Sequence, residues 1–169
     1  MCNTKQYAQM DSYISELSGN PMLSKSFCIT GNPAADTVIS IKKAHADSVG
    51  IRLTCDGDFA WLSHLSPIDV CAVFSNLLDN ALEGSTGAVN PCITIKGKDH
   101  AHFYALMFSN NVPENIKIIN NSVKTSKKDR KHHGFGLSSI NSVVRKYNGS
   151  YTLKCKDMVF CVQAVFPKK

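Results

Sequence analysis

Residues 66–84 read SPIDVCAVFSNLLDNALEG, and they predict a long amphipathic helix packed against a larger core. Ser66 is a good N-cap, Pro67 suits the first helical position, and Asp69 follows the cap by three residues. The apolar residues at positions 70, 73, 74, 77, 78, 81 and 82 form one wide face. Gly84 ends the apolar pattern, so the helix is expected to end there.

A stripe of polar residues runs along this otherwise apolar helix. Asn76, Asn80 and Glu83 are spaced by four and three residues, so they share one side of the helix. Asparagine is a poor helix former, and two of them within five residues need a reason. One explanation is a solvent-facing stripe, which the spacing alone favours. The other is a set of oxygen ligands for a hard cation such as Mg²⁺, which usually joins protein to phosphate.

The elements around this helix predict an α/β fold. Further helices are expected over residues 1–19, 33–50 and 136–147, and strands over residues 51–55, 92–96, 102–108, 151–156 and 159–166. Helices and strands are mixed, yet the last two strands follow each other directly. This order favours a two-layer α/β sandwich, with a mixed sheet and helices on one face. Residues 1–20 are expected to be a helical tail or linker, and residues 21–169 the main domain.

Composition excludes several classes of protein. Of the 169 residues, 43% are hydrophobic and 19% are charged, which is globular rather than disordered. No run approaches the roughly 20 apolar residues of a membrane span, and the start lacks a secretory pattern. These observations are compatible with a soluble piece of a larger membrane protein. The seven cysteines are odd in number and form no Cys-x-x-Cys pair, which favours reduced thiols over disulfides or zinc.

Positive charge is concentrated in one segment. The net charge is +6, and residues 124–133 contain five basic residues and one acidic residue. Gly134 and Gly136 follow, at the start of a predicted helix, where backbone N–H groups and the helix dipole favour anions. A basic segment directly followed by a glycine-rich helix start predicts a phosphate-binding site. Nucleic acid is disfavoured because no aromatic residues interleave with the basic ones, and metal binding by His132 and His133 is also disfavoured.

Two short motifs resemble a known family. Residues 76–83, NLLDNALE, resemble the N box of the GHKL (Bergerat) ATP-binding fold, which gyrase, heat-shock chaperones, histidine kinases and mismatch-repair ATPases share. Residues 133–137, HGFGL, resemble its second glycine box. Residues 124–128 resemble the ATP lid of one branch, the quorum-sensing peptide-receptor type of sensor histidine kinase. The similarity extends over roughly residues 30–167, and the two boxes in this order and spacing are specific.

The resemblance implies a role for each matching position. Asn80 corresponds to the Mg²⁺ ligand, and Asn76 stands where gyrase-like ATPases have the glutamate that activates water. An amide cannot act as a general base, so Asn76 favours phosphoryl transfer over hydrolysis. Asn110 stands where many members have the aspartate that accepts the adenine amino group, and the glycines of that box are absent. The implied ATP-binding residues are Asn76, Asn80, Glu83, Asn110, Thr125, Ser126, Lys127, Lys131, Gly134, Gly136 and Leu137, with Asn76 and Asn80 as catalytic residues.

The resemblance therefore implies the ATP-binding catalytic domain of a bacterial two-component sensor histidine kinase. ATP and Mg²⁺ are the expected cofactors. The γ-phosphate would pass to a histidine on a dimerisation domain outside this chain, and then to a response regulator, of the LytTR type by family analogy. The whole receptor would be membrane-anchored and homodimeric, with this domain in the cytoplasm. The alternatives are a GHKL serine kinase of the anti-sigma-factor type and a degenerate nucleotide-binding module.

Overall fold

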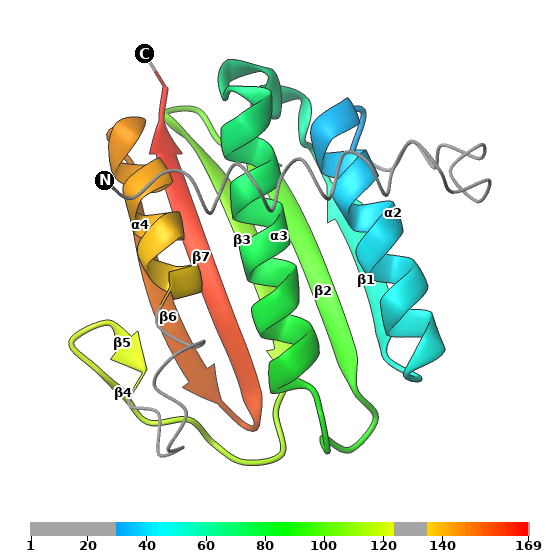
Figure 1. Ribbon diagram of the computed structural model, residues 1–169. Helices are drawn as coiled ribbons and strands as arrows, with labels where there is room; N and C mark the ends of the chain where they lie inside the picture. The colour runs from blue at the N-terminus through cyan, green and yellow to red at the C-terminus, as the bar shows by residue number, and fades with distance from the viewer. Residues whose placement is uncertain (1–29, 124–134, 169) are drawn as a thin grey trace, which may run out of the picture.

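A computed structural model describes residues 30–123 and 135–168 of the chain (Figure 1). The predicted helix over residues 1–19 and the basic segment over residues 124–133 lie outside the described residues. The description of Phe135 and Gly136 is confined to their backbone.

One five-stranded sheet organises the described residues. Its strand order is β1-β2-β3-β7-β6; β1 and β2 are parallel and every other neighbouring pair is antiparallel. The strands are β1 (Arg52–Gly57), β2 (Cys92–Asp99), β3 (Phe103–Asn111), β6 (Ser150–Lys156) and β7 (Val159–Pro167). The three described α-helices, α2 (Pro33–Ser48), α3 (Pro67–Gly84) and α4 (Phe135–Lys146), all cover one face of this sheet (Figure 1). The predicted two-layer α/β sandwich with a mixed sheet is confirmed.

Local sequence signals set the ends of the helices. The side-chain oxygen of Asn32 accepts hydrogen bonds from the backbone N–H groups of Ala34 and Ala35, each at 3.1 Å, and starts α2. The hydroxyl of Ser66 accepts from the N–H of Asp69 at 3.2 Å and starts α3. The chain leaves α2 through Gly50, whose φ of +72° is a conformation that glycine adopts readily.

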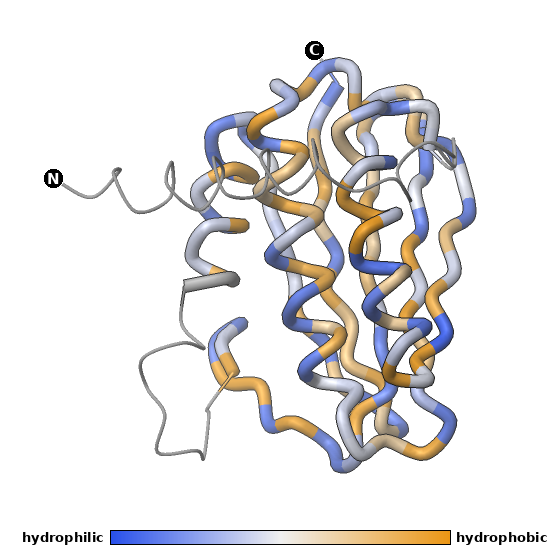
Figure 2. The backbone as a smooth tube through the Cα atoms, turned by 45° about the vertical axis from the view of Figure 1, so that its right-hand side comes forward, coloured by the Kyte–Doolittle hydropathy of each residue, from blue (hydrophilic) through white to orange (hydrophobic). Residues whose placement is uncertain are grey.

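The hydrophobic core fills the space between the helices and the sheet. Phe74 and Leu78 of α3 are fully buried, and the ring of Phe74 meets that of Phe108 edge-on at 5.3 Å. Ile93 and Ile95 of β2 are also fully buried beneath the helices. Hydrophobic and hydrophilic residues alternate along the helices and strands, as an amphipathic layer packing requires (Figure 2).

Two elements are not predicted from the sequence. A 3₁₀-helix, η2 (Ala60–His64), buries Trp61 and Leu62, and the ring of Trp61 stacks on Tyr104 at 5.2 Å. The stretch between the predicted strand over residues 102–108 and the predicted helix over residues 136–147 contains a short hairpin, β4 (Ile118–Ile119) and β5 (Ser122–Val123). Asn120 and Asn121 occupy its turn with φ of 50° and 54°.

Five cysteines lie in the described part of the chain, and all five are free thiols: Cys55, Cys71, Cys92, Cys155 and Cys161. Burial, with a smaller effect from Asp36 and Asp56, raises the pKa of the Cys55 thiol to about 12. Burial also raises the pKa of Cys71 and of Cys161. Cys55, Cys71 and Cys161 therefore stay protonated at neutral pH and act as small apolar side chains.

Candidate functional site

Helix α3 lies between α2 and α4, and its polar residues are divided between these two neighbours (Figure 1). Asp79 faces α2, since its carboxylate accepts a hydrogen bond from the buried Lys42 ammonium at 2.6 Å. Asn80 lies one residue further along, about 100° around the helix. The side of α3 that carries Asn80 is therefore turned away from α2.

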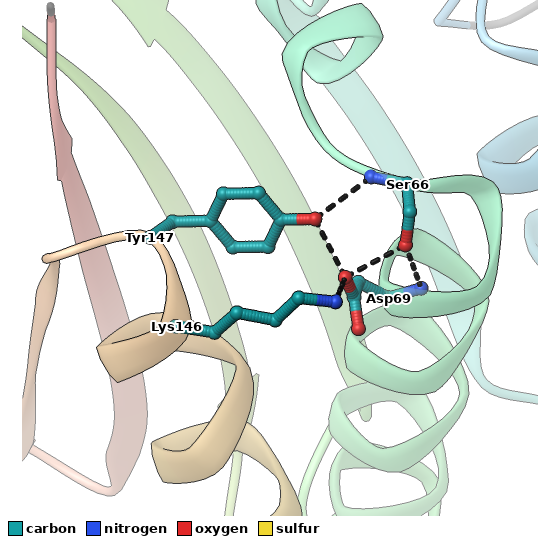
Figure 3. A network of polar contacts seen from close by, with 4 residues as sticks. All are labelled: Ser66, Asp69, Lys146 and Tyr147. Atoms are coloured by element: carbon teal, nitrogen blue, oxygen red, sulfur yellow. Dashed lines mark hydrogen bonds and ion pairs between the residues drawn. The ribbon is translucent and has the colours of Figure 1, made fainter.

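A compact network of hydrogen bonds and an ion pair connects the start of α3 to the end of α4 (Figure 3). The carboxylate of Asp69 accepts hydrogen bonds from the Lys146 ammonium and the Tyr147 hydroxyl, each at 2.6 Å, and from the Ser66 hydroxyl at 2.7 Å. The Tyr147 hydroxyl in turn accepts from the backbone N–H of Ser66 at 2.9 Å. The network joins the N-terminus of one helix to the C-terminus of the other, so α3 and α4 run antiparallel.

This arrangement determines where α4 begins. Its 12 residues span about 18 Å at 1.5 Å per residue. The C-terminal end of α4 lies beside Asp69, and α4 runs back from there along α3. The N-terminus of α4 therefore lies beside the second half of α3, next to the turn that contains Asn76 and Asn80. The N–H groups of the first helical turn, that of Gly136 included, have no partner within the helix and favour an anion. The structure thus brings the asparagine helix and the glycine-containing helix start to the same end of the molecule.

The hydrogen bonds of the network outweigh the cost of burying its carboxylate. Burial alone would raise the pKa of Asp69, but hydrogen bonds from Lys146, Tyr147 and Ser66 lower it below its ordinary value. The bond to Asp69 raises the pKa of Lys146. A carboxyl whose pKa is lowered by folding stabilises the folded state above its unfolded pKa, and this contribution is lost as the pH falls through the folded value.

Asp69→Asn is expected to lower the free energy of unfolding by about 1–3 kcal/mol at pH 7, because the charged hydrogen bonds are lost. The difference from the original protein should shrink as the pH falls below about 4, the ordinary pKa of an aspartate, toward the lowered pKa at which folded Asp69 becomes protonated. Urea denaturation across this pH range measures both effects. Tyr147→Phe, which keeps both charges, should cost less; a pH-independent difference for Asp69→Asn would contradict the assignment.

The two asparagines of α3 lie in different surroundings. Asn76 is half-buried, and its side-chain nitrogen donates to the carbonyl oxygen of Ala72 at 2.8 Å, which leaves its amide oxygen as the group available to a ligand. Asn80 is also half-buried, and its side chain forms no hydrogen bond with another described residue. Half-buried amides normally have partners. Asn80 is therefore the better placed of the two to bind a ligand.

Asn110 lies beneath the C-terminal end of α3. Its side chain is buried, and its amide nitrogen donates to the carbonyl oxygen of Asn111 at 3.0 Å. A β-carbon on Gly84 would lie 3.0 Å from that nitrogen, so a larger residue there would require the Asn110 amide to shift by a few tenths of an ångström. The amide oxygen accepts no hydrogen bond from a described residue, which suits the acceptor role that the resemblance implies.

The other expected site residues fall into two groups. Leu137 is half-buried and packs against the core. Glu83 is exposed and, with Asp79 and His45, lines a hollow of about 500 Å³ on the α2 side of α3, so its place in the ATP site stays a prediction. The remaining five expected residues lie outside the described residues: Thr125, Ser126, Lys127, Lys131 and Gly134.

The network that orients the two helices is not predicted from the sequence. The sequence places Asp69 in the helix start, but its partners Lys146 and Tyr147 are more than 75 residues away along the chain. The only signal was a pair of polar residues at the end of the predicted helix over 136–147. Nothing in their spacing identifies Asp69 as the partner.

The described residues contain neither a metal-binding cluster nor a membrane-spanning helix. Within residues 30–123 and 135–168, no group of three or more His, Cys, Asp or Glu residues could hold a metal ion. In the same part of the chain, no helix is both long and apolar enough to cross a membrane.

Comparison with known families decides the classification. The model of the GHKL domain matches residues 65–167, which contain α3, α4 and every strand except β1. The chain belongs to the GHKL domain family. No curated protein matches it significantly. The matched range includes both the asparagine helix and the glycine-containing helix start of this GHKL domain.

Solved structures confirm the fold of the GHKL domain. The nucleotide-free catalytic domain of histidine kinase ThkA shares 17% identity over 82% of this chain and 94% of that chain, with a TM-score of 0.63. A mycobacterial sensor histidine kinase, MprB, shares 14% identity over 79% and 93% of the two chains, with a TM-score of 0.57. The Acinetobacter baumannii histidine kinase AdeS shares 11% identity over 82% and 65%, with a TM-score of 0.58. The chain is a GHKL ATP-binding domain with the fold of histidine kinase catalytic domains.

Proposed function

We propose that this GHKL domain is the catalytic domain of a sensor histidine kinase, which binds ATP with Mg²⁺ between α3 and α4. The observation that supports this most is the antiparallel pairing of these helices, which sets Asn76 and Asn80 beside the N-terminus of α4. That N-terminus would hold the phosphates through backbone N–H groups, including that of Gly136. Asn110 would accept a hydrogen bond from the adenine amino group. Thr125, Ser126, Lys127, Lys131 and Gly134 would close over the phosphates.

The available donor atoms fit Mg²⁺. The described residues offer no carboxylate or histidine cluster for a metal, but they offer the amide oxygens of Asn76 and Asn80. Mg²⁺ is held in nucleotide sites by few protein oxygens, with phosphates and waters supplying the rest. When bound, it would neutralise charge on the phosphates. We assign the protein ligand to Asn80, the position that the resemblance implies, because its side chain bonds no other described residue, whereas the nitrogen of the Asn76 amide already bonds its own helix.

The proposed reaction is phosphoryl transfer to a histidine of a dimerisation domain outside this chain. The bond between the γ-phosphorus and its bridging oxygen breaks and ADP leaves, a phosphorus–nitrogen bond forms, and the imidazole proton passes to a base outside this chain or to solvent. Asn76 supports transfer over hydrolysis, because its amide cannot take a proton from water. The chain's part is to hold the triphosphate and exclude water, since phosphoryl transfer depends mainly on positioning and electrostatics.

The proposal extends to the rest of the receptor. The phosphate would pass from the histidine to an aspartate of a response regulator, of the LytTR type if the receptor belongs to the quorum-sensing branch. The receptor would be homodimeric and membrane-anchored, with this domain in the cytoplasm. The resemblance of the segment 124–128 to the lid of that branch supports this part of the proposal.

The proposed reaction is tested by mixing this chain with the dimerisation domain from its own gene and ATP labelled on the γ-phosphate. Acid-labile, base-stable label on the dimerisation domain, lost when its histidine is replaced, is the expected result. Acid-stable label on a serine would contradict the histidine kinase assignment and favour the anti-sigma-factor type. ATP binding without any transfer would contradict catalysis and favour a degenerate module.

Asn110→Ala is expected to weaken ATP binding by about 1–3 kcal/mol, because a buried hydrogen bond to adenine is lost. Binding of inorganic triphosphate, which has no base, should change far less. Competition of both ligands against a fluorescent ATP analogue measures the two affinities. Equal losses for ATP and triphosphate would place the adenine contact elsewhere.

A further inference from the structure

The face of the sheet opposite the helices carries a distinct pattern of charge. The alternation of each strand turns Ile93 and Ile95 toward the helices, and turns Lys96 and Lys98 of β2 to the other face. The same alternation on β6 turns Leu153 toward the helices and turns Lys154 and Lys156 outward. All four lysines are exposed. We call this surface the open face.

The two lysine pairs flank a neutral stripe formed by the strands between them. The register of the ladders places β3 and β7 between β2 and β6. The outward residues of these two central strands are Phe103, Ala105, Met107, Ser109, Asn111, Val159, Cys161, Gln163, Val165 and Pro167. None of them is charged. The outward positions of β2, β3, β7 and β6 therefore combine four lysines with no acidic residue.

Few acidic residues among those described lie close enough to neutralise these lysines. Lys96, Lys98 and Lys154 form no ion pair with a described residue, and Lys156 only approaches Asp157 at 4.0 Å. Asp56, opposite Lys96 on the edge strand β1, is the one outward acid on the sheet, and the outward Arg52 accompanies it on that strand. The open face thus presents an excess of positive charge on both sides of a neutral centre.

The dimensions of the stripe match an α-helix. Adjacent strands lie about 4.8 Å apart, so β2 and β6 are separated by three spacings, about 14 Å, and the ladders set Lys154 two residues further along the strands than Lys96. An α-helix with its side chains is about 10–12 Å wide. The nine residues of β3 span about 30 Å, the length of a helix of about 20 residues. One helix lying along the strands would cover the neutral stripe, with one flank meeting the β2 lysines toward one end and the other flank meeting the β6 lysines toward the other end.

We propose that the open face is a docking surface for an amphipathic helix of a partner protein, whose flanks carry Asp and Glu. Its apolar side packs on Met107 and Val165, which are half-buried, and its acidic flanks pair with the two lysine rows. A membrane surface is a poorer match, since the large apolar residues of the stripe are half-buried, apart from Val159 at its end, which is 38% exposed. The surface is separate from the proposed nucleotide site.

The proposal is tested with a designed peptide of about 20 residues that is helical, apolar on one side and glutamate-rich on both flanks. Fluorescence anisotropy measures its affinity for the full chain and for the triple variant K96Q/K98Q/K154Q. The matched control is K43Q/K117Q/R145Q, which removes the same charge from the half-buried Lys43 and the exposed Lys117 and Arg145, all outside the open face. Melting temperatures show that all three proteins are folded.

The open-face variant is expected to bind the peptide about tenfold or more weakly than the original chain, and the control variant within about twofold of it. Equal losses for both variants would show a general charge effect and overturn the proposal. Absence of binding to the original chain at low salt would also overturn it. Binding to vesicles of anionic phospholipid is measured in the same way. Lysine-dependent binding to the vesicles but not to the peptide would overturn the helix proposal and indicate a membrane surface as the ligand.

Discussion

Asn80→Ala should reduce Mg²⁺-dependent ATP binding by about 100-fold or more, the largest loss expected from any single site residue. Loss of an outer-shell partner of a metal typically costs 10–100-fold, and a direct ligand should cost at least as much. The fold should survive, because Asn80 is only half-buried and bonds no other described residue through its side chain. Titration of ATP with and without Mg²⁺ measures the effect.

Two further variants make the Asn80 result specific. Asn80→Asp keeps an oxygen ligand and should retain Mg²⁺-dependent binding to within about tenfold. Asn141→Ala makes the same truncation on α4, where the side chain only accepts a bond from Arg145 at 3.2 Å, and should leave binding unchanged. Retained Mg²⁺ dependence in Asn80→Ala would refute the assignment of the metal ligand.

Gly136→Val should abolish phosphate binding with little effect on folding. A branched side chain in the first turn of α4 would occupy the space through which phosphate approaches the backbone N–H groups. Loss of two charge-assisted hydrogen bonds of about 1.5–3 kcal/mol each corresponds to about 100-fold or more in ATP affinity. Valine has a higher helix propensity than glycine, so the helix itself should not be weakened.

The control for Gly136→Val is Ser142→Val, which places the same side chain at an exposed position of the same helix. Its ATP affinity should equal that of the original chain. If Gly136→Val binds ATP normally while remaining folded, the N-terminus of α4 does not hold the phosphates. The site would then have to lie elsewhere along α3.

The architecture was predictable because local signals agree along most of the chain. Asn32 with Pro33 and Ser66 with Pro67 set two helix starts, and the alternation of apolar residues defined the strands. The 3₁₀-helix around Trp61 was missed because it is held by packing against Tyr104, more than 40 residues away. The hairpin at Asn120 and Asn121 was missed because its strands are two residues long and show no periodicity.

The candidate site was predictable only in part. The spacing of Asn76 and Asn80 placed both on one side of a helix, but spacing alone favoured a solvent-facing stripe. Both asparagines lie beside the start of α4 only because α3 and α4 pack antiparallel. The hydrogen bond between Asp69 and Tyr147 stabilises this packing, and these two residues are far apart in sequence. The orientation of the Asn110 amide depends on its bond to Asn111 and on the close approach of α3.

Isothermal titration of ATP into the full chain, with Mg²⁺ and again with a chelator, tests most directly whether α3 and α4 form a nucleotide site. We expect one site per chain, heat that depends on Mg²⁺, and a higher melting temperature at saturating nucleotide. Absence of heat and of any melting shift at millimolar ATP, in protein shown to be folded by its melting transition, would contradict this expectation.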